Sequence, residues 1–155
     1  MFDPLGLASV RLVPTVEDFA KTVWGNPNRY DPGWVYHGLL AGTPGDAVRF
    51  LHKLMSGDVL RPDLLAEAIT PHPVGGPWGD RPWRKGGYGL RLMIGEASPG
   101  TAIGHSGAGP GSVAAIYHFP DRALPCTVAV FAQGEDRPSD VGLVEEEAVR
   151  LAPSE

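Results

Sequence analysis

Residues 101–132, TAIGHSGAGPGSVAAIYHFPDRALPCTVAVFA, contain three apolar stretches separated by turn-forming residues. Each stretch has β-branched or aromatic residues and few charges, which favours strands. The expected strands are 101–106, 112–119 and 125–132. Pro120 and Asp121 form a turn signal between the last two, so these two strands should pair as an antiparallel hairpin. This part of the chain therefore predicts an antiparallel sheet.

Helix signals lie on both sides of this predicted sheet. Thr43 can cap a helix that Pro44 opens, and apolar residues follow at helical spacing as far as Gly57, a favourable residue just past a helix end. The other expected helix starts are Thr15, Pro62 and either Ser139 or Asp140. Helices before a series of strands, with another helix after it, indicate an α+β fold in which helices pack on the sheet.

Three further segments complete the predicted layout. Residues 88–94 alternate like a strand. Residues 70–87 are rich in proline and glycine and predict a loop, which Trp78 and Trp83 should anchor by packing. The three glutamates at 145–147 predict a solvated face of the last helix.

Composition limits the classes of partner. The 155 residues fit one domain, 1–155, and the formal net charge of −5 with no basic block argues against nucleic acid and anionic membrane surfaces. No stretch is apolar enough to span a membrane and no export signal is present, so the cytoplasm is the default expectation. Cys126 is expected to be a small core residue, and the five histidines lack metal-ligand spacing, so we expect no metal site.

The glycine-rich string GHSGAGPG at 104–111 is the best candidate for chemistry. Its pattern is partly that of a nucleophile elbow, but an elbow needs a helix to begin at the serine, and the glycines after Ser106 oppose one. The string also lacks the lysine of a phosphate-binding loop. A glycine-rich turn without chemistry is the remaining alternative at this point.

Four segments occur in the order found in one family of hydrolases. Residues 2–7, beginning at Phe2, are similar to F-x-P-L-G-M, and the segment from His37 to Leu51 is similar to G-G-L-x-S-T-x-x-D-x-x-R-F. Residues 88–92 are similar to a Y-G-L-G strand, and 104–111, which include Pro110, to G-H-x-G-x-x-P-G. The chain thereby resembles the C-terminal part of serine hydrolases of the β-lactamase and penicillin-binding-protein superfamily, in its class C β-lactamase and esterase branch.

This resemblance implies roles for His105, Ser106, Gly107 and Ala108, which match the third catalytic motif of the superfamily. His105 would supply a positive or hydrogen-bonding group, and the Ser106 hydroxyl would bind a substrate carboxylate or carbonyl. Gly107 would let substrate approach the strand, and the Ala108 N–H would be one of two oxyanion-hole donors. The reaction would be acyl transfer from a small ester, β-lactam or peptide, without a cofactor.

The nucleophile and general base of that superfamily are missing from the sequence. No serine is followed three residues later by lysine, as S-x-x-K requires, and no tyrosine begins a Y-x-N or Y-x-S motif. In the superfamily both motifs precede the P-L-G-M element, at which this chain begins. We therefore expect a hydrolase portion that is inactive alone; the alternatives are a non-catalytic binding module and one chain of a split hydrolase.

Two further expectations follow from strand geometry. Adjacent strand residues point to opposite faces, so His105 is badly placed to act as a base for Ser106. If an N-terminal half is absent, the strand over 125–132 or its neighbour should have an unpaired edge, through which the chain could associate with itself.

Overall fold

The computed structural model describes residues 3–26, 28–36, 38–75, 78–79, 81–98, 100–109 and 111–153. The motif residues Phe2, His37 and Pro110 lie outside these ranges. The helices are α1 Val16–Ala20, α2 Pro44–Met55, α3 Pro62–Ala68 and α4 Pro138–Leu151, with short 3-10 turns at Asp3–Leu5 and Pro32–Trp34. The strands are β1 Arg11–Leu12, β2 Leu40–Ala41, β3 His72–Pro73, β4 Lys85–Tyr88, β5 Met93–Ala97, β6 Gly100–Gly109, β7 Ser112–Phe119 and β8 Cys126–Gln133.

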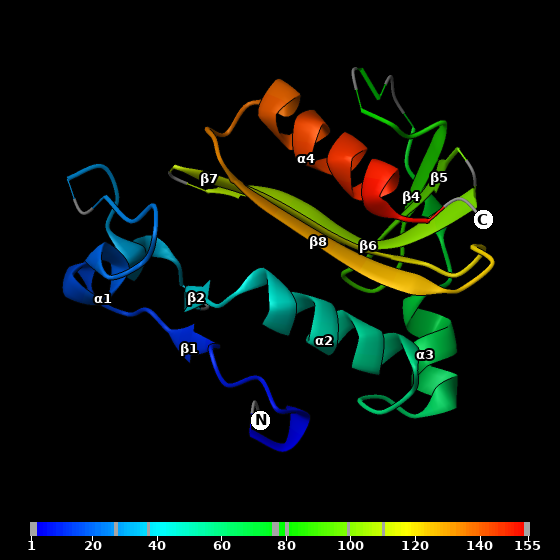
Figure 1. The fold of residues 1–155 in the computed structure, drawn as a ribbon, viewed down its shortest axis with the longest axis horizontal. Coiled ribbons are helices and arrows are strands. Elements are labelled where there is room, and N and C mark those ends of the chain that lie inside the picture. The colour runs from blue at the N-terminus through cyan, green and yellow to red at the C-terminus, as the bar shows by residue number, and fades with distance from the viewer. Residues whose placement is uncertain are drawn as a thin grey trace.

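Six strands form one antiparallel sheet in the order β3-β4-β5-β6-β7-β8 (Figure 1). Each strand pairs with the next one along the chain, and the β7–β8 hairpin places Phe119 opposite Cys126. The predicted α+β class and the predicted hairpin are confirmed. Within the described residues β8 pairs only with β7, so its other side is an open edge.

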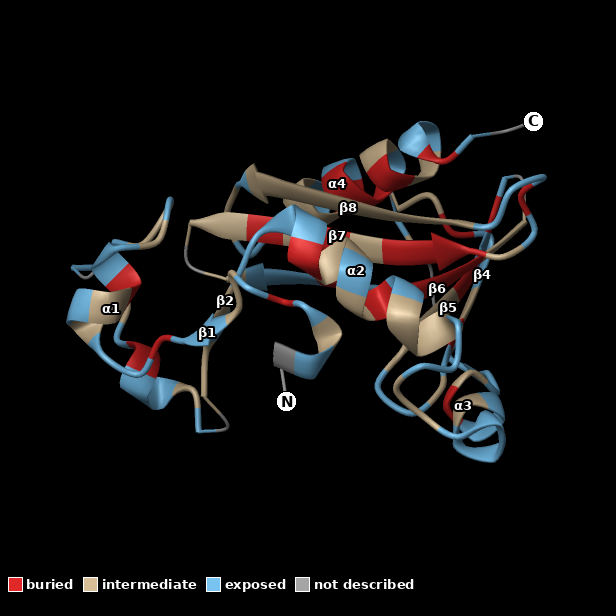
Figure 2. Cartoon of the chain, turned by 60° about the horizontal axis from the view of Figure 1, so that its bottom comes forward, coloured by how far each residue is buried: buried red, intermediate tan, exposed pale blue. Residues whose placement is uncertain are grey.

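The two long helices lie on opposite faces of the sheet (Figure 1). Helix α4 packs on β7 and β8 on one face, where Tyr117, Val144 and Ala148 belong to the main buried cluster. Helix α2 packs on the same two strands from the other face. Figure 2 shows burial concentrated in the central strands and their flanking helices, whereas the α1 and α3 segments are mostly exposed.

Helix α2 begins as its sequence predicts. The Thr43 side chain accepts a hydrogen bond from the backbone N–H of Asp46, and Pro44 occupies the first turn, where no N–H is needed. At the other end, Gly57 has a φ of 83°, in the left-handed region that ends helices. The helix over 44–55 is therefore determined largely by local sequence.

The predicted strand over 88–94 is wrong, because the chain turns back within it. Strands β4 and β5 pair as a hairpin on either side of a turn in which Arg91 has a φ of 61°. Strand β4 also extends into the predicted loop over 70–87. Here a Cβ on Gly86 would lie 2.4 Å from Trp78, and one on Gly95 would lie 2.6 Å from Trp83. Because these glycines have no side chains, both indoles can lie directly on the strands. This packing explains the glycines in β4 and β5, and the alternation of apolar and polar residues does not reveal it.

Two predictions for the last helix are also wrong. Helix α4 has no side-chain cap; the Asp140 carboxylate instead accepts a hydrogen bond from the backbone N–H of Glu135. Glu145 is fully buried, not solvated. It lies on the same helix face as Val144 and Ala148, so its position in the helix turns it toward the sheet. No helix in the described part of the chain is long and apolar enough to cross a bilayer.

Candidate active site

Strand β6 carries the motif residues and presents them alternately to the two faces of the sheet. Ser106 pairs with Ala115 and faces α4, whereas His105 pairs with Ile116 and faces the other side. Gly104 lets β6 approach β7 closely, since a Cβ there would lie 2.0 Å from the carbonyl oxygen of Ile116. The structure thus confirms that His105 and Ser106 point to opposite faces of the sheet.

His105, Gly107 and Ala108 are the exposed residues of the motif, and His105 and Gly107 lie on the same face of the strand. The Nε2 atom of His105 lies 3.4 Å from the hydroxyl of Tyr88, and the two rings meet edge to face with their centroids 6.1 Å apart. A Cβ built on Gly107 would meet no atom within 4 Å. The strand therefore has open space over Gly107, beside an imidazole that can donate or accept a hydrogen bond.

Ser106 has a different environment from the one that the sequence resemblance implied. Its side chain is only 4% exposed, and its hydroxyl donates to Oε1 of Glu145 at 2.5 Å. The hydroxyl thus lies inside the molecule, on the face opposite to His105. In this structure Ser106 contacts helix α4 and not the open space over the strand.

Glu145 is the centre of a buried polar cluster formed with Arg81, Trp83, Ser106 and Tyr117, here called the Glu145 cluster. Its Oε2 atom accepts from Nε of Arg81 at 2.7 Å and from Nε1 of Trp83 at 3.0 Å. Its Oε1 atom accepts from the Tyr117 hydroxyl at 3.1 Å and from Nη2 of Arg81. The hydrogen bond to Glu145 raises the pKa of Arg81, and burial, reinforced by the Glu145 charge, raises the pKa of Tyr117.

Sequence reasoning missed Glu145 because three adjacent glutamates resemble a solvated helix face. The signal that finds it is the spacing of Val141, Val144, Glu145 and Ala148, which is the i, i+3, i+4, i+7 pattern of a buried stripe. A charged residue within such a stripe requires partners, and Arg81 and Trp83 supply them from the predicted loop.

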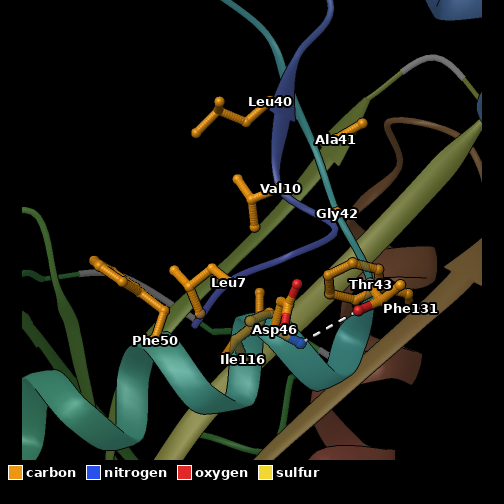
Figure 3. A pocket seen from close by; sticks show the side chains of 11 residues that line it. Leu7, Val10, Leu40, Ala41, Gly42, Thr43, Asp46, Phe50, Ile116 and Phe131 are labelled. Carbon is orange, nitrogen blue, oxygen red and sulfur yellow. Dashed lines mark hydrogen bonds between the residues drawn. The ribbon is translucent and has the colours of Figure 1, made fainter. Parts of the chain in front are cut away.

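A cavity of about 470 Å³ lies on the α2 face of the sheet (Figure 3). Ile116 and Phe131 form its sheet side, Phe50 comes from α2, and Leu7 and Val10 come from the N-terminal segment. Ile116 is the cross-strand neighbour of His105, so the cavity and the exposed imidazole share one face of the sheet.

The one carboxylate at this cavity already has its own partners. Asp46 accepts from the backbone N–H of Ser9 at 2.7 Å, from the Ser9 hydroxyl at 2.5 Å and from Nη1 of Arg49 at 2.5 Å. The hydrogen bonds from Ser9 hold the pKa of Asp46 below its usual value. The cavity therefore presents a mainly apolar wall. In the described residues no three His, Cys, Asp or Glu side chains are arranged to hold a metal ion.

Comparison with known proteins identifies the family of this chain. The family model "Beta-lactamase" matches residues 1–151. The chain belongs to the β-lactamase family. This confirms the resemblance that the four sequence segments carry. No curated protein matches the sequence.

Solved structures of hydrolases have the same fold. The D-amino acid amidase from Ochrobactrum anthropi SV3 superposes with a TM-score of 0.73 at 20% identity, covering 97% of this chain and 48% of the amidase. A D-stereospecific amidohydrolase from Streptomyces sp. superposes with a TM-score of 0.64 at 20% identity, covering 91% and 44%. This member of the β-lactamase family therefore spans about half the length of the solved structures it matches.

Proposed function

We propose that this chain forms one wall of a serine acyl-hydrolase site and carries the third motif of that site on strand β6. His105 and Gly107 line the wall, the Ala108 N–H acts as an oxyanion donor, and Ser106 anchors the strand from behind. The observation that carries the proposal is the empty space over Gly107 beside His105, on the motif strand of a β-lactamase family member.

The reaction proposed for the complete site is hydrolysis of a small amide or ester, including a β-lactam, through an acyl-enzyme. The substrate would lie along β6 at Gly107, where no side chain blocks the backbone. A preorganised N–H at Ala108 would stabilise the negative charge that develops on the carbonyl oxygen, a contribution of roughly 10²–10³ in rate for such donors. No cofactor is part of the proposal.

The nucleophile of the proposed site comes from polypeptide other than these 155 residues. The sequence contains neither S-x-x-K nor Y-x-N, and the matched structures are about twice as long as this chain. The face that carries His105 also holds the large cavity, so a second polypeptide can approach the motif from that side. Alone, the chain is proposed to be inactive.

The test has two parts. The purified chain is assayed with a chromogenic β-lactam, a p-nitrophenyl ester and a D-amino acid p-nitroanilide, and we expect no turnover above the rate with bovine serum albumin. The coding DNA upstream is then read for S-x-x-K and Y-x-N, and any polypeptide that carries both is co-expressed with this chain. Activity of the pair supports the proposal. Turnover by the chain alone overturns it, and so does a stable pair without activity.

A non-catalytic binding module is the second candidate. The apolar cavity favours it, because a cavity of this size can hold a small apolar molecule without any nucleophile. A coding region without the two missing motifs, together with a monomeric and cooperatively folded chain, would support this alternative.

A further inference from the structure

Strand β6 contains little side-chain information about how it should pair with its neighbour. Its sequence, GTAIGHSGAG, has four glycines and two alanines in ten residues. The hydrophobic pattern and the connecting turn together set the register of a hairpin, and glycine-rich strands are weakly specified by their own side chains. The loop between the paired residues Gly109 and Ser112 has two residues, so it restrains the register of β6 and β7 from the end of the hairpin. A shift by one residue would turn His105 inward and Ser106 outward, which would exchange the two faces of the motif.

Glu145 adds a side-chain restraint on the register along the strands, because it binds both of them at one atom. Its Oε1 accepts from the Ser106 hydroxyl of β6 at 2.5 Å and from the Tyr117 hydroxyl of β7 at 3.1 Å. Ser106 is paired with Ala115, two residues from Tyr117 on the same face. The two hydroxyls therefore converge on one oxygen in the observed register, and a one-residue shift would remove Ser106 from that face.

The other members of the Glu145 cluster hold the carboxylate in place. Arg81 binds both of its oxygens and also donates to the Ser106 hydroxyl at 3.2 Å, while Trp83 donates to Oε2. Movement of one strand would break hydrogen bonds to this buried carboxylate. Each break costs free energy, because the donor would be left unpaired in a dry environment. The cluster is thus selective for one arrangement of the strands.

We propose that Glu145 is a positioning residue for strand β6. By holding the register of β6 against β7, it keeps His105 and Gly107 on the open face and fixes the position of the Ala108 N–H along the strand. The importance of that face rests on the proposed function, but the register can be measured without any activity.

The test compares Glu145→Gln with Asp46→Asn by NMR on the full chain. Both changes neutralise a buried, hydrogen-bonded carboxylate, but Asp46 lies in α2 and its carboxylate binds Ser9 and Arg49. In Glu145→Gln we expect a second set of β6 signals, with weaker cross-strand contacts between His105 and Ile116 and between the His105 and Tyr88 rings. Amide exchange in 103–108 should accelerate about tenfold or more relative to β8, the factor for loss of one charged hydrogen bond. Asp46→Asn should leave these signals unchanged.

Several outcomes would overturn the proposal. One is a Glu145→Gln variant that melts at a lower temperature but keeps the wild-type β6 contacts, since Glu145 would then only stabilise the fold. If Glu145→Gln does not fold, the Ser106→Ala, Tyr117→Phe double variant replaces it, because the carboxylate there keeps Arg81 and Trp83. An unchanged β6 pattern in that variant also overturns the proposal. Failure of the co-expressed pair to hydrolyse any substrate would contradict the proposed function and leave this measurement intact.

Discussion

Two glycines of strand β6, three residues apart, have opposite surroundings. A Cβ at Gly104 would collide with the backbone of Ile116, which cannot rotate away as a side chain can, whereas one at Gly107 would enter open space. We expect Gly104→Ala to lower the free energy of unfolding by roughly 1–3 kcal/mol, as overpacking does. Gly107→Ala, the matched control, should stay within about 0.5 kcal/mol of wild type. Urea denaturation measures both, and equal losses would contradict the close approach of β6 to β7.

Ser106 is the motif residue whose chemistry the structure restricts most. Its hydroxyl is buried and already donates to Glu145, so we expect no reaction with a serine-directed fluorophosphonate. Intact-mass spectrometry after prolonged incubation checks this, with an active serine β-lactamase as the positive control. Stoichiometric labelling at Ser106 would show that the hydroxyl is a nucleophile and would contradict its role as an anchor.

The contribution of the His105 imidazole to catalysis in the proposed site can be measured. In a co-expressed active pair, His105→Ala should lower kcat/KM by about 10²-fold, the usual size of a lost proton-transfer or hydrogen-bonding group. Ser98→Ala and Ser139→Ala serve as controls, since both serines are exposed and lie outside the motif. Similar losses in all three variants would refute the assignment of the site to residues 105–108.

At the scale of elements, sequence patterns predict those parts whose determinants are local. Thr43, Pro44 and Gly57 define α2 through capping and turn chemistry, and Pro120–Asp121 defines the β7–β8 hairpin in the same way. The β4–β5 hairpin differs from the single predicted strand because the chain turns at Arg91, whose φ of 61° is uncommon for a residue other than glycine, and because Trp78 and Trp83 of the preceding loop pack on its glycines. Tertiary contacts of this kind have no signature in the local pattern.

The sequence pattern predicts which residues form the motif, but it does not predict the burial of Ser106. The string at 104–111 identified His105, Ser106 and Gly107, and strand alternation separated His105 from Ser106 correctly. The burial of Ser106 depends on Glu145, which lies 39 positions along the chain. No rule of local spacing connects residues so far apart.

The packing of α2 on the sheet should depend on pH through His118. Its Nδ1 lies 2.9 Å from the Thr127 hydroxyl, and burial, together with His52 of α2, lowers its pKa. A lowered pKa means that the unfolded chain binds the proton more tightly. The stabilisation is therefore complete above the unfolded pKa of about 6.5 and is lost as pH falls toward and through the lower folded value. Thermal melts from pH 8 to pH 5 should show a fall in Tm that His118→Gln reduces; an identical fall in that variant would rule His118 out.

At the scale of the whole molecule, the open edge of β8 should promote self-association. Strand β8 has eight residues, and none is charged, glycine or proline, so it lacks the usual features that prevent edge pairing. We expect sedimentation velocity to show concentration-dependent oligomers. Ala129→Lys should reduce them by placing a charge on the edge strand. Leu124→Lys adds the same charge in the exposed turn and should leave the oligomers unchanged. Oligomers that persist equally in both variants would show that the contact does not involve β8.

The two faces of the sheet are unequal. The α4 face is closed by the Glu145 cluster and the aromatic core, whereas the α2 face combines the large cavity with the exposed His105. We therefore expect a hydrophobic dye to bind on the α2 face. Phe131→Lys should weaken its fluorescence, while Leu143→Lys, an exposed position on α4, should not. Equal loss in both variants would locate the dye elsewhere.

The single cysteine makes the open space over Gly107 accessible to chemical screening. Cys126 is partly buried, and burial raises the pKa of its thiol, so it reacts slowly. A thiol introduced by Gly107→Cys would lie exposed beside His105 and would react first with a library of disulfide fragments. The fragments retained there would report which chemical groups the strand accepts, so that the preferences of the site could be mapped before its natural substrate is known.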